Sequence, residues 1–164
     1  MKIYWVDQLQ KGKIGMSTRP RGGEWLEIDI QKLVLASTDI LVSLLNHSEI
    51  KELKLETEKT ISHQLGIEYI NYEIEDRHVP ESLITFKKLI FYLHGQLLKG
   101  KTIVIHCKMG IGRTSIVSAS LLSIYSSFYN DVFTLLSNVI GLTVPDIEEQ
   151  KQWTLEFIES LNYK

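Results

Sequence analysis

Several features that define other classes of protein are scarce in this sequence. Of its 164 residues only one is a cysteine, Cys107, so no disulfide can form within the chain, and a small disulfide-stapled fold is excluded. There are only three prolines, no internal repeat and no Pro/Ser-rich linker, so nothing divides the chain. We therefore expect a single domain over residues 1–164, long enough to bury a full core.

The sequence also has no large excess of either positive or negative charge and no long apolar run. The 18 Lys and Arg residues nearly balance 20 Asp and Glu, without the basic excess that is typical of nucleic-acid binding. No stretch approaches the roughly 18 apolar residues of a membrane span. Asp7, Gln8 and Lys11 interrupt any signal-peptide core near the start. We expect a cytoplasmic protein with no membrane anchor and no nucleic-acid partner.

The hydrophobic pattern alternates between strands and helices. Apolar runs predict buried strands at residues 40–45, 70–74 and 103–105. Helical spacing follows over residues 83–97, then over 131–140, and again from about residue 145, where Asp146 and Glu149 stand at capping-box spacing. This order predicts an α/β fold with a mostly parallel central sheet of four to five strands flanked by helices.

The single cysteine ends one of these strands and begins a glycine-bearing loop. KTIVIHC is followed by KMGIGRTS and then by the helical run IVSASLL. A five-residue loop between a strand and a helix N-terminus can turn its backbone N–H groups toward one anion, and Gly110 and Gly112 permit unusual dihedrals there. The predicted phosphate-binding residues are those of the loop and the arginine that follows: Lys108, Met109, Gly110, Ile111, Gly112 and Arg113.

The residue types in this loop suit nucleophilic attack on phosphorus. A helix N-terminus and a neighbouring cation stabilise a thiolate, which is the reactive form of Cys107. Arg113 offers a planar fork that can bind two phosphate oxygens at once. The hydroxyl of Thr114 could donate to the sulfur when the sulfur has to leave again.

The segment HCKMGIGRTS, residues 106–115, resembles the protein tyrosine phosphatase signature His-Cys-x2-Gly-x2-Arg-Ser/Thr at every constrained position. The chain is more specifically similar to small dual-specificity phosphatases of the cyclin-dependent kinase inhibitor 3-like or prokaryotic type. This resemblance implies a cysteinyl-phosphate intermediate, no cofactor and no metal, with His106 ordering the loop behind the sulfur.

The resemblance also implies a general acid on a loop upstream of the cysteine. IEDRHVP, residues 74–80, is similar to the Ile-x-Asp-x3-Pro form of that loop, which makes Asp76 the candidate and Glu75 the alternative. A positioned acid that protonates the departing oxygen contributes roughly 10² to 10⁴-fold to the rate.

Two further segments, TRPRGGEWL and VPDIEEQKQW, resemble the same small phosphatases. They imply that Gln150, or else the nearby Gln152, positions the hydrolytic water. Arg19, Arg21 and Lys108 are candidate substrate contacts. For Arg19 and Arg21 the sequence fits equally well with two solvent-exposed loop arginines that have no such role.

These observations predict a protein phosphatase for phosphotyrosine, phosphoserine or phosphothreonine. A phosphoinositide phosphatase is the alternative, because Lys108 adds a charge to the loop, and a non-catalytic phosphoprotein-binding module is a weaker one. The other histidines, His47, His63, His78 and His94, show no metal-ligand spacing. Oligomeric state and the preferred phosphorylated residue stay open.

Overall fold

The computed structural model describes residues 1–6, 9–125 and 132–162, and it has a five-stranded sheet at its centre. The strands are β1 (Ile3–Val6), β2 (Lys13–Thr18), β3 (Ile40–Ser43), β4 (Glu68–Asn71) and β5 (Thr102–Cys107), in the spatial order β1-β2-β5-β3-β4. Only β1 pairs antiparallel, with β2, and every other pairing is parallel. The predicted mostly parallel α/β sheet is confirmed.

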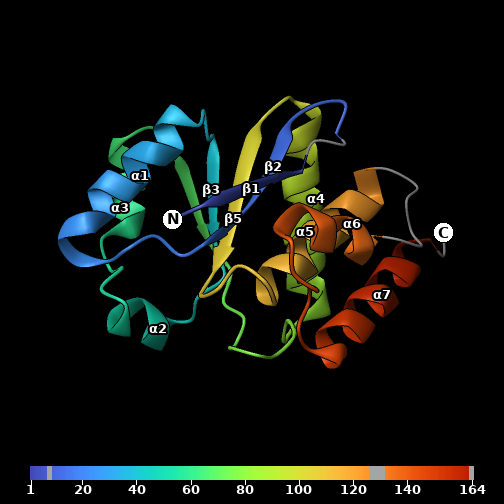
Figure 1. Ribbon diagram of the computed structural model, residues 1–164. Helices are drawn as coiled ribbons and strands as arrows, with labels where there is room; N and C mark the ends of the chain where they lie inside the picture. The colour runs from blue at the N-terminus through green and yellow to red at the C-terminus, as the bar shows by residue number, and fades with distance from the viewer. Residues whose placement is uncertain (7–8, 126–131, 163–164) are drawn as a thin grey trace.

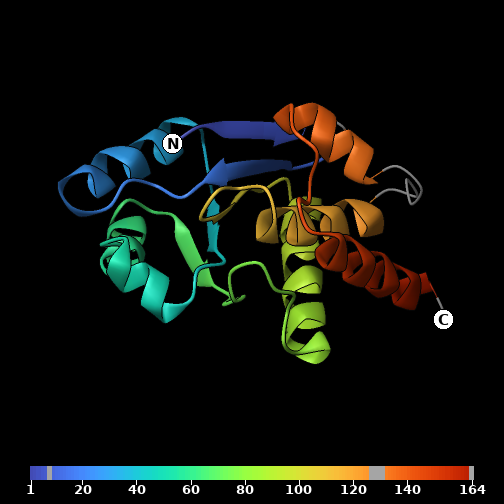
Figure 2. The same ribbon diagram turned by 60° about the horizontal axis from the view of Figure 1, so that its bottom comes forward.

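Helices cover both faces of this sheet (Figures 1 and 2). One face carries α1 (Leu26–Leu35) and α3 (Glu58–Gln64), with α2 (His47–Glu52) beside them. The other carries α4 (Leu83–Leu98) and α5 (Arg113–Tyr125), and α6 (Val132–Ile140) and α7 (Glu148–Asn162) pack on α5. A short 3-10 turn, η1 (Gly23–Trp25), precedes α1. Among the described residues, no helix is both long enough and apolar enough for a membrane crossing.

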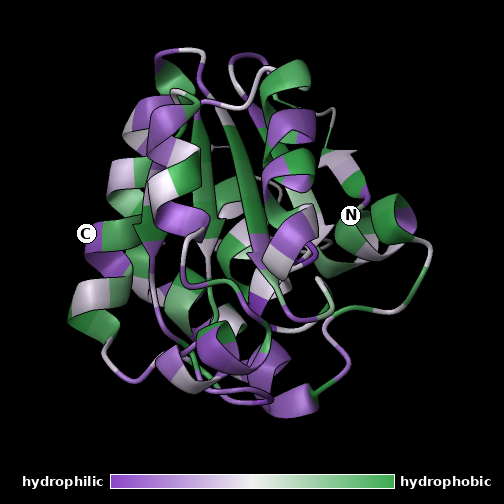
Figure 3. Ribbon diagram, turned by 90° about the vertical axis from the view of Figure 1, so that its left-hand side faces the viewer, coloured by the Kyte–Doolittle hydropathy of each residue, from purple (hydrophilic) through white to green (hydrophobic). Residues whose placement is uncertain are grey.

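Strand β5 is buried along its whole length because it runs between β2 and β3 and under helices on both sides. Its side chains alternate between the faces. Ile103, Ile105 and Cys107 join the core under α4 and α5, whereas Val104 joins the core under α1 and α3. Figure 3 shows this apolar sheet between helices whose outer surfaces are mixed or polar. The alternation turns the side chains of Cys107 and His106 toward opposite faces.

Two predicted boundaries were wrong. The strand predicted over residues 70–74 is β4 (Glu68–Asn71), which ends three residues earlier. Beyond it the N–H groups of Tyr72 and Ile74 still donate to the carbonyls of Ser43 and Leu44, and the Asn71 side chain donates to the carbonyls of Ser43 and Leu45. The last helix begins at Glu148 instead of near residue 145, which leaves Asp146 in the segment before it. The start predicted at Asp131 lies outside the described residues.

Candidate active site

Cys107 lies at the carboxyl end of β5 and is only 3% exposed. Residues 108–112 then turn sharply and α5 begins at Arg113, so the loop joins a buried strand to a helix N-terminus. The backbone N–H of Gly110 donates to Sγ of Cys107 over 3.2 Å. The turn therefore aims a backbone donor at the sulfur.

The two loop glycines are required for different reasons. Gly110 has a φ of +76°, and a Cβ there would lie 2.6 Å from the carbonyl oxygen of Ser17, so both conformation and space require glycine. Gly112 does not adopt a positive φ, contrary to the expectation of unusual dihedrals at both positions. A Cβ on Gly112 would instead lie 2.8 Å from Oε1 of Gln150, so this glycine makes room for the glutamine.

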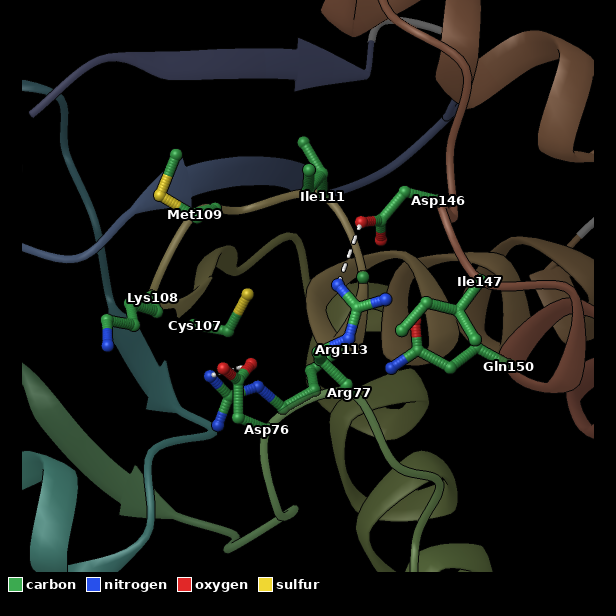
Figure 4. Close-up of a pocket in the computed structure, with 11 residues that line it drawn as sticks. Asp76, Arg77, Cys107, Lys108, Met109, Ile111, Arg113, Asp146, Ile147 and Gln150 are labelled. Carbon is green, nitrogen blue, oxygen red and sulfur yellow. Dashed lines mark hydrogen bonds and ion pairs between the residues drawn. The ribbon is translucent and has the colours of Figure 1, made fainter.

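A pocket opens above Cys107 (Figure 4). Its lining comes from three parts of the chain: the segment after β4, the loop after β5 and the beginning of α7. The lining residues are Asp76, Arg77, Cys107, Lys108, Met109, Ile111, Gly112, Arg113, Asp146, Ile147 and Gln150. Five of the six predicted phosphate-binding residues are among them, and the sixth, Gly110, faces the sulfur with its N–H.

The guanidinium of Arg113 is almost fully buried and is held by Glu49 of α2. Nη1 and Nη2 of Arg113 donate to the two carboxylate oxygens of Glu49 over 2.6 and 2.8 Å. Nη1 also donates to the carbonyl oxygen of Ile74 over 2.9 Å. Among the described residues, Nε of Arg113 forms no hydrogen bond, so Nε and Nη2 form the edge that can hold two phosphate oxygens.

Electrostatics keep this buried pair charged. Burial by itself would lower the pKa of Arg113, but the hydrogen bonds to Glu49 and the nearby Cys107 and Asp76 raise it overall. Burial likewise opposes ionisation of Glu49, yet the hydrogen bonds from Arg113 and Asn46 hold the pKa of Glu49 below its usual value. The charged pair therefore persists at neutral pH, and its contribution is lost only in acid, as the pH falls through the lowered pKa of Glu49.

Asp76 lies at the pocket, as predicted, and its side chain is 54% exposed. Its Oδ1 lies 3.1 Å from Nη2 of Arg113 and accepts a hydrogen bond from it. A phosphate bound on the same guanidinium edge would compete for Nη2 and turn the carboxylate toward the leaving group. Glu75, the alternative acid, is not in the pocket, and it accepts a hydrogen bond from Asn46 over 2.9 Å.

The structure separates the two candidate glutamines. Gln150 is 1% exposed and lines the pocket, and its Nε2 donates to the carbonyl oxygen of His78 over 2.8 Å. Its Oε1 is buried over Gly112 and has no hydrogen-bond partner among the described residues. Gln152 is exposed and bonds to Glu156 one turn further along α7. Only Gln150 is therefore placed to contact a water molecule in the pocket.

Thr114 and His106 are both fully buried next to the loop. No hydrogen bond from the Thr114 hydroxyl is present among the described residues, so the expected bond to the sulfur is not formed in this state. The side chain of His106 points from β5 to the face of the sheet opposite Cys107, where its Nε2 lies 3.0 Å from Oε1 of Glu58 in α3 without being aligned for a hydrogen bond. Nδ1 of the ring lies 3.4 Å from the carbonyl oxygen of Cys107.

Of the three candidate substrate contacts, only Lys108 lines the pocket. Arg21 pairs with the buried Asp29 through two hydrogen bonds of 3.0 and 2.7 Å, and this pairing holds the pKa of Asp29 well below its usual range. Arg19 donates to the carbonyl oxygen of Pro20. Arg21 therefore has a structural partner in α1, and neither arginine is brought to the site.

Sequence reasoning missed three charged residues of the site, Glu49, Arg77 and Asp146, the last read only as a helix cap. Glu49 was detectable as the third residue after the helix cap Asn46, a capping box that the structure forms in both directions. No sequence pattern marks Arg77 or Asp146 as part of the site. They face each other across the pocket, with Nη1 and Oδ2 separated by 3.9 Å (Figure 4).

A thiol at the end of a central parallel strand, a glycine turn that aims an N–H at its sulfur and a buried arginine at the following helix are features of the cysteine-dependent phosphatase class. A family model described as "Polymorphic toxin system, DSP-PTPase phosphatase" matches residues 14–126. The chain therefore belongs to this family. It is a phosphatase, a small dual-specificity-like member of the protein tyrosine phosphatase superfamily.

Solved structures share the fold. A kinase-associated phosphatase with its catalytic-site cysteine replaced by serine is 18% identical, covers 100% of this chain and 97% of its own, and superposes with a TM-score of 0.90. The phosphatase PTPMT1 is 15% identical over 98% and 96% of the two chains, with a TM-score of 0.74. Human DUSP28 is 13% identical over 90% and 92%, with a TM-score of 0.66. No curated protein matches the sequence.

The Glu49–Arg113 pair leads to a first prediction. Glu49→Gln keeps the shape of the side chain but leaves a buried arginine without its charged partner, which costs several kcal/mol in typical proteins. We expect a lower melting temperature and roughly tenfold lower kcat/KM for p-nitrophenyl phosphate, measured by thermal denaturation and steady-state kinetics. Glu52→Gln, an exposed change on the same helix, is the control. A Glu49 variant with wild-type stability and kinetics would contradict this role.

Proposed function

We propose that this chain removes phosphate from phosphorylated proteins in two displacement steps. The sulfur of Cys107 attacks phosphorus, the bond between phosphorus and the ester oxygen breaks, and Asp76 donates its proton to the departing oxygen. Water positioned by Gln150 then attacks the cysteinyl phosphate and gives a proton back to Asp76. The S–P bond breaks, inorganic phosphate leaves and the thiolate is restored.

The observation that carries this proposal is the convergence on one pocket of Cys107, Asp76, Arg113 and Gln150 from three distant parts of the chain. Each residue meets a different requirement of the reaction. Cys107 is the nucleophile and Asp76 the acid, Arg113 binds the phosphate, and Gln150 is the polar group that contacts water. The Nε and Nη2 edge of Arg113 and the loop N–H groups stabilise charge on the transferring phosphoryl group. This chemistry needs no metal and no cofactor.

The cellular compartment and the extent of the domain are part of the same proposal. Cys107 has to stay reduced to act as a nucleophile, which favours a reducing compartment such as the cytoplasm. We take residues 1–164 as one phosphatase domain, since the helices on both faces pack on a single sheet. The family description names a DSP-PTPase phosphatase, which supports phosphorylated proteins as substrates.

A phosphoinositide substrate is the second candidate. The structural neighbour PTPMT1 is also known in complex with PI(5)P, at 16% identity and a TM-score of 0.75. Lys108 lines the pocket and would contribute a cation to either substrate class.

Release of phosphate from p-nitrophenyl phosphate tests the reaction class directly. We expect turnover in the presence of EDTA at the rate seen without it, with saturation kinetics and competitive inhibition by vanadate. Rapid acid quenching during turnover should trap phosphate on the peptide that contains Cys107, detected by mass spectrometry. Turnover that depends on added metal, or phosphate trapped on another residue, would contradict the mechanism.

A further inference from the structure

The charged groups of the pocket are almost all paired with one another. Arg113 is held by Glu49 and Asp76, and Arg77 faces Asp146 at 3.9 Å. Lys108 is the one cation of the pocket lining that forms no ion pair among the described residues. Together with the loop N–H groups and the Nε and Nη2 edge of Arg113, from which a phosphate would displace Asp76, this lysine can balance one phosphate dianion. The lining offers no further unpaired cation for a second phosphate.

Asp146 places a carboxylate, paired with Arg77 at 3.9 Å, on the side of the pocket near α7. Its Oδ1 lies 3.4 Å from the position that a Cβ on Gly112 would occupy, so the carboxylate sits directly above the phosphate loop. Figure 4 shows Asp146 on the opposite side of Cys107 from Lys108. The Asp146 side chain is 42% exposed, so a substrate group that enters the pocket can reach it.

A second hollow is lined by residues that flank Asp76 and Arg77 along the chain. Residues 73–75 and 78–81 line it, on either side of the pocket residues Asp76 and Arg77, and Trp153 of α7 completes its wall. Three of its lining residues are Glu73, Glu75 and Glu81. Neither Glu73 nor Glu81 forms a hydrogen bond or ion pair with the described residues. An apolar wall beside unpaired carboxylates suits the long methylene stem and charged end of lysine or arginine.

We propose that the pocket selects singly phosphorylated polypeptides that carry lysine or arginine beside the phosphorylated residue, and that Asp146 and Glu81 set this preference. The inference rests on the proposed phosphatase function. The phosphate binds at the loop and Arg113, while a neighbouring basic side chain meets Asp146 or the second hollow. A polyphosphorylated lipid headgroup would bring its additional phosphates against the same carboxylates.

The test compares kcat/KM for one phosphopeptide sequence made with lysines or with glutamates flanking the phosphorylated residue. A soluble short-chain phosphatidylinositol bisphosphate is the third substrate, and p-nitrophenyl phosphate normalises each enzyme. We expect wild type to prefer the lysine peptide by about fivefold or more, the scale of an exposed ion pair or two, with the preference shrinking in high salt. The bisphosphate lipid should be the poorest of the three.

Asp146→Asn combined with Glu81→Gln should reduce the preference between the two peptides to less than about twofold. Asp146→Lys should raise relative activity on the bisphosphate lipid. Glu149→Gln, an exposed change on α7 outside both hollows, should leave the preference as in wild type. Melting temperatures of all variants check that they are folded.

Two results would overturn the proposal: a wild-type enzyme that prefers the bisphosphate lipid or the glutamate peptide, or a preference for lysine that survives in the double variant. Both leave hydrolysis of p-nitrophenyl phosphate intact, so the proposed function would stand. Loss of that hydrolysis in wild type would instead reject the phosphatase mechanism, and the substrate preference with it.

Discussion

Replacing Cys107 by serine should reduce turnover of p-nitrophenyl phosphate by about 10³-fold or more, because a hydroxyl is not ionised at neutral pH and cannot replace the thiolate as nucleophile. Binding of phosphate or vanadate should remain, since the loop N–H groups and the buried Arg113 are unchanged. Steady-state kinetics and calorimetric titration with phosphate measure the two effects separately.

The control for Cys107→Ser is a measurement that shows the variant is folded. Cys107 is 3% exposed and packs in the core under α4 and α5, so a serine of similar size should shift the melting temperature by only a few degrees. Arg113→Lys, in contrast to Cys107→Ser, should bind phosphate more weakly, because the charge remains but the bidentate contact is lost. Residual turnover above a tenth of wild type in Cys107→Ser would reject the nucleophile assignment.

Asp76→Asn should lower kcat on phosphopeptides by roughly 10² to 10⁴-fold, because the leaving alkoxide or phenoxide then departs without a proton. The variant should keep its stability, since the side chain is half exposed. Substrates with good leaving groups, such as p-nitrophenyl phosphate, should be affected much less. A series of aryl phosphates with different leaving groups measures this dependence.

The matched control is Glu75→Gln, one residue away but outside the pocket. It should retain wild-type dependence on the leaving group. The opposite pattern would move the acid to Glu75.

The fold was predictable where burial imposed a pattern on consecutive residues. The runs that became β3 and β5 contain three consecutive apolar residues each, ILV and IVI, because both faces of a central parallel strand are covered. Strands β1 and β2, at the end of the sheet away from β4, were not predicted. Strand β1, IYWV, has only one buried residue of four, and β2, KIGMST, is interrupted by a glycine, so neither has the continuous apolar run of a central strand.

By itself the sequence determined the loop around Cys107, because the cysteine, the N–H donor of Gly110 and Arg113 are neighbours along the chain and their geometry follows from a strand, a short turn and a helix. Only the tertiary structure decided which distant charges surround that loop. Glu49, Arg77 and Asp146 reach it from separate loops and helices, and ordinary surface glutamates, arginines and aspartates look the same in sequence. The choice between Gln150 and Gln152 was likewise decided by the rotation of α7, which buries one glutamine over Gly112 and leaves the other in solvent.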